Sequence, residues 1–159
     1  MTIEWCFATF AATAVCIACM AHIVITDLTT RLISTRACQV LGIAGAMLQL
    51  LIAGLDGLVV GLFSMVAITV INIAINAIAH SRLQDRGIGG GDVRCMAAIA
   101  LATGRGCIMG VLSCCVIAVM WALAMQVVGL RDRDEPFAFA PFMAIWLVVG
   151  IVAGLSIWV

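Results

Sequence analysis

Long apolar stretches make up most of the chain, and short segments that hold most of the charged residues separate them. A helix needs about 20 apolar residues to cross the hydrocarbon core of a bilayer. The pattern therefore predicts an all-α, polytopic bundle of about six transmembrane helices, forming one membrane-embedded domain over residues 1–159. The expected spans are residues 3–25, 37–54, 57–79, 93–103, 107–129 and 140–159.

The arginines predict which way these helices run, because cytoplasmic loops of membrane proteins are enriched in Lys and Arg. All eight basic residues are Arg, and seven of them lie in the loops 26–36, 80–94 and 130–139. The eighth, Arg105, follows the fourth span. We therefore expect the N-terminus outside and these three loops in the cytoplasm. Trp5 and Trp158 would then lie at the outer membrane surface, where indole rings are common.

The composition agrees with a membrane location and argues against a nucleic-acid-binding function. The 159 residues are 65% hydrophobic and 10% charged, whereas a soluble domain is about half apolar and about a quarter charged. The formal net charge is zero, which argues against a nucleic-acid partner. Most of the eight cysteines lie in apolar stretches, so we expect them to pack as small apolar residues. We expect no metal and no other cofactor.

The fourth apolar segment is too short to cross the membrane. Arg105 lies only 13 positions after Asp92, about 20 Å of helix against a core of about 30 Å. Four glycines before Asp92 let the backbone bend and approach another segment closely: Gly87, Gly89, Gly90 and Gly91. Irregular backbone at this depth is tolerated where it lines protein or a water-filled cavity. We therefore expect Asp92 to lie below the inner membrane surface, where water reaches it.

Asp27 and Asp92 are the candidate catalytic residues. Asp27 ends the first span and Asp92 begins the fourth, so both lie on the predicted cytoplasmic side. Taken alone, either residue is explained as a surface charge or a helix cap. Asp56, which lies in a short turn between two expected spans, is explained in the same way. Two carboxylates within hydrogen-bond reach, however, share a proton. One can then deprotonate a water while the other protonates the substrate carbonyl, which hydrolyses a peptide bond without a metal.

Four segments together resemble the type IV prepilin peptidases. Gly89-Gly90-Gly91-Asp92 has the form of the G-x-G-D motif of membrane aspartic peptidases, and Arg94 stands where that family commonly has lysine. Residues 96–104 resemble the helix that follows the motif. Residues 27–33 resemble the first-aspartate segment, although Ser34-Thr35 replaces the Pro-Asn that often follows it. Residues 136–142 resemble the segment leading into the last helix. The ordered set is more specific than G-x-G-D alone.

The resemblance implies an aspartic endopeptidase that cuts the leader from type IV pilin-like precursors at the cytoplasmic face of the cell membrane. It would be the short, stand-alone form, related to archaeal preflagellin peptidases. Asp27 and Asp92 would be catalytic, and Gly89, Gly90, Gly91 and Arg94 would be supporting motif residues. Family members that N-methylate the trimmed pilin carry a cytoplasmic loop with paired Cys-x-x-Cys zinc ligands. This chain has no such loop, so we expect cleavage without methylation.

Two other function classes stay open at the level of sequence. Acidic residues beside glycine-rich, broken helices also occur in small transporters and channel subunits. Against that class, the acids lie near one face of the membrane and the chain has no visible inverted repeat. A non-catalytic pilus or secretion assembly protein could keep the family pattern, but the presence of both aspartates argues against it.

Two further polar groups are expected to play secondary roles. Asn72 and Asn76 share one helix face; they could line the cleft, but interhelical hydrogen bonding is the commoner role of such residues. The mixed charges of residues 131–135 are most simply a solvated loop. Their acidic members could also meet the basic leader of a substrate.

Overall fold

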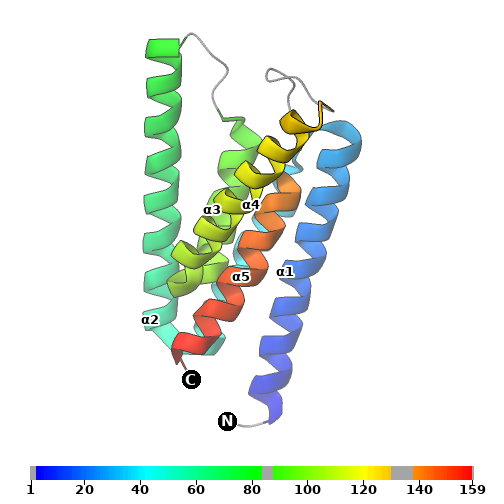
Figure 1. Cartoon of the computed structure of the whole chain (residues 1–159). Coiled ribbons are helices and arrows are strands. Elements are labelled where there is room, and N and C mark those ends of the chain that lie inside the picture. Colours follow the sequence, from blue (N-terminus) through cyan, green and yellow to red (C-terminus); the bar gives the residue numbers. More distant parts are fainter. Residues whose placement is uncertain (1–2, 84–87, 130–137, 159) are drawn as a thin grey trace.

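The computed structural model describes residues 3–83, 88–129 and 138–158, and all regular structure within them is helical. The prediction of an all-α protein is therefore confirmed for this part of the chain (Figure 1). A π-helical turn, η1, extends the second helix, and a 3-10 turn, η2, joins the third helix to the fourth. The elements in order are α1 (Ile3–Thr30), α2 (Thr35–Ile78), η1 (Ala79–Leu83), α3 (Gly90–Thr103), η2 (Gly104–Gly106), α4 (Cys107–Val127) and α5 (Ala140–Trp158).

The boundary between α1 and α2 follows from local backbone chemistry. α1 stops where Arg31 adopts a left-handed conformation, with φ of 55°, which ends regular helical geometry. Ser34 then caps α2, because its hydroxyl accepts a hydrogen bond from the backbone N–H of Ala37 at 3.4 Å. The Ser34-Thr35 pair therefore begins the second helix with a side-chain cap.

α2 reverses its direction at Gly54. This residue has φ of 64° and ψ of −146°, a combination that glycine reaches at little steric cost. The two limbs then pack closely: a Cβ atom on Gly57 would lie 2.6 Å from the carbonyl oxygen of Gln49, and one on Gly61 would lie 3.4 Å from its Cγ. In a straight helix, Gln49 and Gly61 would be about 18 Å apart. The limbs therefore form a helical hairpin.

The prediction of about six transmembrane helices is wrong as a count of continuous helices. Among the described residues, three helical runs are long and apolar enough to span a membrane: Cys6–Thr30, Thr35–Ser81 and Gly90–Val127. The last apolar helix, Ala140–Ser156, is shorter. The count falls because the helix resumes directly after Gly54 in α2 and after the 3-10 turn η2. Two pairs of predicted spans therefore merge into two long runs.

The outer surface of the bundle is apolar. Phe7, Phe63 and Ile108 are each more than 70% exposed, and many other large apolar side chains are exposed on every long helix. Such a surface is unfavourable in water but is stable in lipid. The side chains of Trp5 and Trp158, expected at the outer membrane surface, lie outside the described residues.

α3 lies at the centre of the bundle, where every residue from 98 to 103 is buried. Its 14 residues span about 21 Å, in agreement with the short fourth segment. Small residues allow close contact with α2, since a Cβ atom on Gly45 would lie only 2.6 Å from that of Ala102. Gln49 holds the C-terminal end of α3 by donating from Nε2 to the carbonyl oxygen of Ala102 at 2.6 Å.

Three helix ends gather at one end of the bundle. At the top of Figure 1, the C-terminal end of α1 lies near the N-terminal ends of α3 and α5, whereas both chain termini lie at the bottom. Asp27 is in the last turn of α1 and Asp92 in the first turn of α3. The fold thus brings both candidate residues to the same end.

Candidate active site

Asp27 is almost fully buried, with 7% of its surface exposed. Its Oδ2 accepts a hydrogen bond from the backbone N–H of Ala140 at 3.0 Å. Ala140 is the first residue of α5, and the first N–H groups of a helix have no partner within it and carry the positive end of its dipole. The start of α5 therefore offers an unsatisfied donor to a negative group, and Asp27 joins α1 to α5 by accepting from it.

Asp92 lies in the first turn of α3 and is half-buried. Its side chain turns back toward the residue before the helix, since a Cβ atom on Gly89 would lie 3.0 Å from its Oδ2. The charge of Asp27 acts on Asp92, and both carboxylates act on the buried thiol of Cys95, one turn further along α3. The two predicted residues are therefore close enough to repel each other when both are ionised.

The glycines of the motif have unequal surroundings. A Cβ atom on Gly91 would lie 3.1 Å from the Cβ of Ile33, in the segment that follows Asp27. A Cβ atom on Gly90 would meet nothing within 4 Å. A side chain at position 89 or 91 would therefore contact neighbouring atoms closely. A side chain at position 90, the variable position of the motif, would not. Contact between Gly91 and Ile33 ties the chain after Asp27 to the chain before Asp92.

Asn76, for which the sequence favours an interhelical hydrogen bond, contacts the segment just before the glycine motif. Its Nδ2 donates to the carbonyl oxygen of Ile88 at 3.1 Å, and its Oδ1 accepts from the N–H of Ile88 at 2.6 Å. One side-chain amide therefore pairs with both backbone groups of the residue just before Gly89. Asn72, one turn earlier, instead donates to the carbonyl oxygen of Ile68 in its own helix at 2.8 Å. Of these two asparagines, Asn76 alone connects α2 to the segment before the motif.

Arg94 is exposed and connects α3 to the start of α2. Its Nη1 donates to the hydroxyl of Thr35 at 3.1 Å. This contact fixes the two helix starts relative to each other at the end of the bundle that carries the aspartates. Among the described residues, no three potential metal ligands gather at one point.

Several predicted features lie outside the described residues: Gly87, the mixed-charge residues 131–135, and residues 136–137, which begin the segment 136–142 leading into the last helix. The end of that segment is described. The carbonyl oxygen of Phe139 accepts from the N–H groups of Phe142 and Met143 at 3.1 and 3.3 Å, which begins α5. This segment thus places the N–H of Ala140 against Asp27.

Comparison with known proteins supports the same interpretation. Searches of curated proteins and of solved structures each gave no match. The model of the type IV leader peptidase family matches residues 14–130, most of the chain, and the matched region includes Asp27, Asp92 and the glycine motif. The chain therefore belongs to the type IV leader peptidase family.

Proposed function

We propose that this integral membrane protein is an aspartic endopeptidase that removes the leader of type IV pilin-like precursors, with Asp27 and Asp92 as its catalytic residues. Family membership implies a peptidase with prepilin-like substrates. The observation that supports the proposal is that two carboxylates from different helices lie at the same end of the bundle, where the charge of Asp27 acts on Asp92. Asp27 is held by the first N–H of α5, and Asp92 lies within reach of its charge.

The proposed chemistry needs one ionised and one protonated carboxyl group. The ionised group takes a proton from a water molecule, and the water oxygen bonds to the carbonyl carbon of the scissile peptide. The protonated group gives its proton to the carbonyl oxygen. The C–N bond then breaks, and the leaving nitrogen receives a proton from the pair. In this proposal the motif residues Gly89, Gly91 and Arg94 support the position of Asp92, while Gly90 belongs to the motif at a position with open surroundings.

The proposal includes one domain over residues 1–159, with the N-terminus outside and the aspartates near the cytoplasmic face. The positive-inside tendency supports this orientation. Arg31, Arg36 and Arg94 lie at helix ends near the aspartates, whereas Arg105 lies in η2, beyond the far end of α3. We also propose that the enzyme cleaves without N-methylation, because the sequence has no paired zinc-binding loop.

Co-expression with tagged precursors tests this function. Each precursor carries a basic leader followed by an apolar segment, and product size and N-terminal mass are measured. We expect one shortened product with a free, unmethylated N-terminus. If no precursor in the panel is cut while the protein is correctly inserted in the membrane, the proposed function is wrong.

Substitution of the motif glycines is expected to lower cleavage by different amounts, because their surroundings differ. Gly91→Ala places a methyl group 3.1 Å from the Cβ of Ile33, so the two segments must separate by a few tenths of an ångström. We expect precursor cleavage to fall about tenfold, since catalysis is sensitive to small displacements of reacting groups. Gly90→Ala is the matched control, because nothing lies within 4 Å of its added methyl group. Equal losses in the two variants would contradict the proposed role of the contact.

A further inference from the structure

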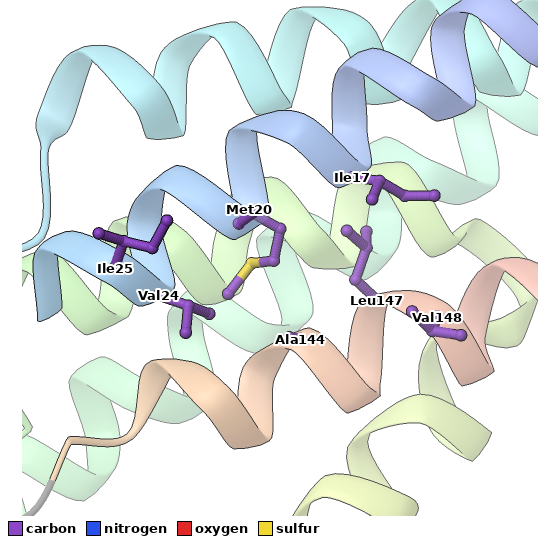
Figure 2. A pocket seen from close by; sticks show the side chains of 8 residues that line it. Ile17, Met20, Val24, Ile25, Ala144, Leu147 and Val148 are labelled. Carbon is purple, nitrogen blue, oxygen red and sulfur yellow. The ribbon is translucent and has the colours of Figure 1, made fainter. Parts of the chain in front are cut away.

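Two cavities at the surface of the bundle differ in their chemistry. The groove between α1 and α5 is lined by apolar side chains alone (Figure 2). A second, open cavity of about 470 Å³ lies between α3 and both limbs of α2. Its lining includes three polar residues and a cysteine: Thr35, Gln39, Arg94 and Cys38. Of these two cavities, the second therefore contains a side chain that can react with a small molecule.

The packing of α2 against α3 places Cys38 opposite Cys95. The two helices run side by side in the same direction, and their contacts in order along α2 are those of Thr35 with Arg94, Gly42 with Ala98 and Gly45 with Ala102. Cys38 lies one turn before Gly42 in α2. Cys95 lies one turn before Ala98 in α3. The side chains of the two cysteines are accordingly hydrogen-bonded to each other.

The spacing of the two helices suits a disulfide between these cysteines. A disulfide joins Cα atoms that lie about 4.4–6.8 Å apart, so the two backbones must be close. A Cβ atom on Gly42 would lie 3.8 Å from that of Ala98, which shows that they are close one turn further along. Cys38 and Cys95 are 4% and 0% exposed, and both thiols are free.

The two thiols have different electrostatic surroundings. The charge of Arg94 acts on Cys38, and that of Asp92 acts on it more weakly. Cys95 lies one turn after Asp92 and is acted on by both aspartates. A reactive cysteine usually lies beside a cation and within reach of solvent. Cys38, beside Arg94 and on the cavity, is therefore the thiol that reacts first.

We propose that Cys38 and Cys95 are a modification site, which forms a reversible disulfide when hydrogen peroxide enters this cavity, and that the bridge lowers peptidase activity. Disulfides in the cytoplasm are usually transient and redox-sensing, and the proposed cytoplasmic end of the bundle carries this pair. The bridge itself depends on the two thiols alone, whereas its effect on cleavage rests on the proposed function.

The reaction consumes one hydrogen peroxide for each bridge. The sulfur of Cys38 bonds to one peroxide oxygen, the O–O bond breaks, and the leaving hydroxide takes the thiol proton to become water. The sulfur of Cys95 then attacks the sulfenic acid on Cys38, the S–O bond breaks, and a second water leaves with the proton of Cys95. The two thiols lose two electrons, which the peroxide gains. A small thiol reverses the bridge by exchange.

The bridge acts on Asp92 through one turn of α3. An S–S bond of about 2 Å replaces a hydrogen-bonded contact between the two sulfurs, so the start of α3 is drawn toward α2. Asp92 is three residues before Cys95 and moves with it. Because a displacement of about 1 Å at a reacting group costs about 10²-fold, we expect the bridge to lower the cleavage rate at least tenfold.

Peptide mapping of the wild type tests the bridge itself. The protein in lipid vesicles is treated with hydrogen peroxide, the remaining thiols are alkylated after denaturation, and linked peptides are identified by mass. We expect a peptide that joins Cys38 to Cys95 and that dithiothreitol separates. Cys114 is the internal control, because it is equally buried at 2% exposure in α4 and should stay free. Free Cys38 and Cys95 after treatment, or a loss at Cys114 as large as theirs, would overturn the proposal.

Cleavage of a tagged precursor before and after peroxide treatment tests the effect on activity. The wild-type rate should fall at least tenfold and recover with dithiothreitol. Cys38→Ala and Cys95→Ala cannot form the bridge, so each should keep its own untreated rate, while Cys114→Ala should be inhibited like the wild type. Equal inhibition of all three variants would trace the loss to another oxidised group and overturn the regulatory role. A wild type that cleaves no precursor before treatment would count against the proposed function alone, since peptide mapping still decides whether the bridge forms.

Discussion

Asp27→Asn and Asp92→Asn are each expected to lower precursor cleavage by about 10² to 10⁴-fold, the usual contribution of a general acid or base. Asparagine keeps the shape of the side chain but cannot exchange a proton. At position 27 its oxygen can still accept the hydrogen bond from Ala140, so the contact between α1 and α5 can persist. Initial rates of product formation at equal protein content measure the effect. Asp56→Asn is the control, because Asp56 is exposed beside the reversal of α2.

The double variant tests whether the two aspartates act as one unit. Groups that serve the same step lose activity non-additively, so removing the second costs little once the first is gone. We therefore expect Asp27→Asn with Asp92→Asn to cleave about as slowly as the slower single variant. Losses that multiply would show that the two carboxylates act in separate steps.

Asn76→Ala is expected to have the second largest effect. It removes the partner of both backbone groups of Ile88. These groups are partly buried, so each one left without a hydrogen bond costs at most the roughly 1–3 kcal/mol of a fully buried group. The segment before Gly89 then loses its fixed position, and a displacement of about 1 Å at a reacting group costs about 10²-fold. We expect kcat to fall by about 10- to 100-fold with a smaller change in KM. Steady-state kinetics on a tagged precursor measure both constants.

Asn72→Ala is the matched control for Asn76→Ala. Asn72 lies on the same face of α2, and its side chain bonds only to the carbonyl oxygen of Ile68 in its own helix. Removing it should leave the motif in place. Asn76→Asp keeps the acceptor but loses the donor to Ile88, so intermediate activity is expected. If Asn72→Ala and Asn76→Ala lower kcat equally, Asn76 stabilises only the bundle.

The apolar pattern predicted where helices form but not how they continue into one another. Segments 37–54 and 57–79 were separated correctly near Gly54, yet they form one helical run with a sharp reversal. Gly54 and Asp56 mark the reversal in the sequence, but they do not show that the helix resumes directly after it. The short α3 was predictable, since Asp92 and Arg105 bound it in the sequence.

The sequence predicted only part of the candidate site. The two aspartates were identified by their residue type and by the resemblance, and the structure brings them within electrostatic reach. Two contacts could not be predicted, those of Asp27 with Ala140 and of Asn76 with Ile88. In both, the partner is a backbone group, and side-chain patterns do not show which backbone groups a fold leaves unsatisfied. The family match replaces the transporter alternative with a peptidase.

The most direct test of the account uses purified protein in lipid vesicles with one tagged pilin-like precursor. The masses of the products are measured for the wild type and for Asp92→Asn. The account predicts that the wild type releases the leader and leaves a precursor shortened at its N-terminus, while Asp92→Asn leaves the precursor intact. The same shortened product from Asp92→Asn, at the wild-type rate, would contradict the central claim that Asp27 and Asp92 together cut the peptide bond.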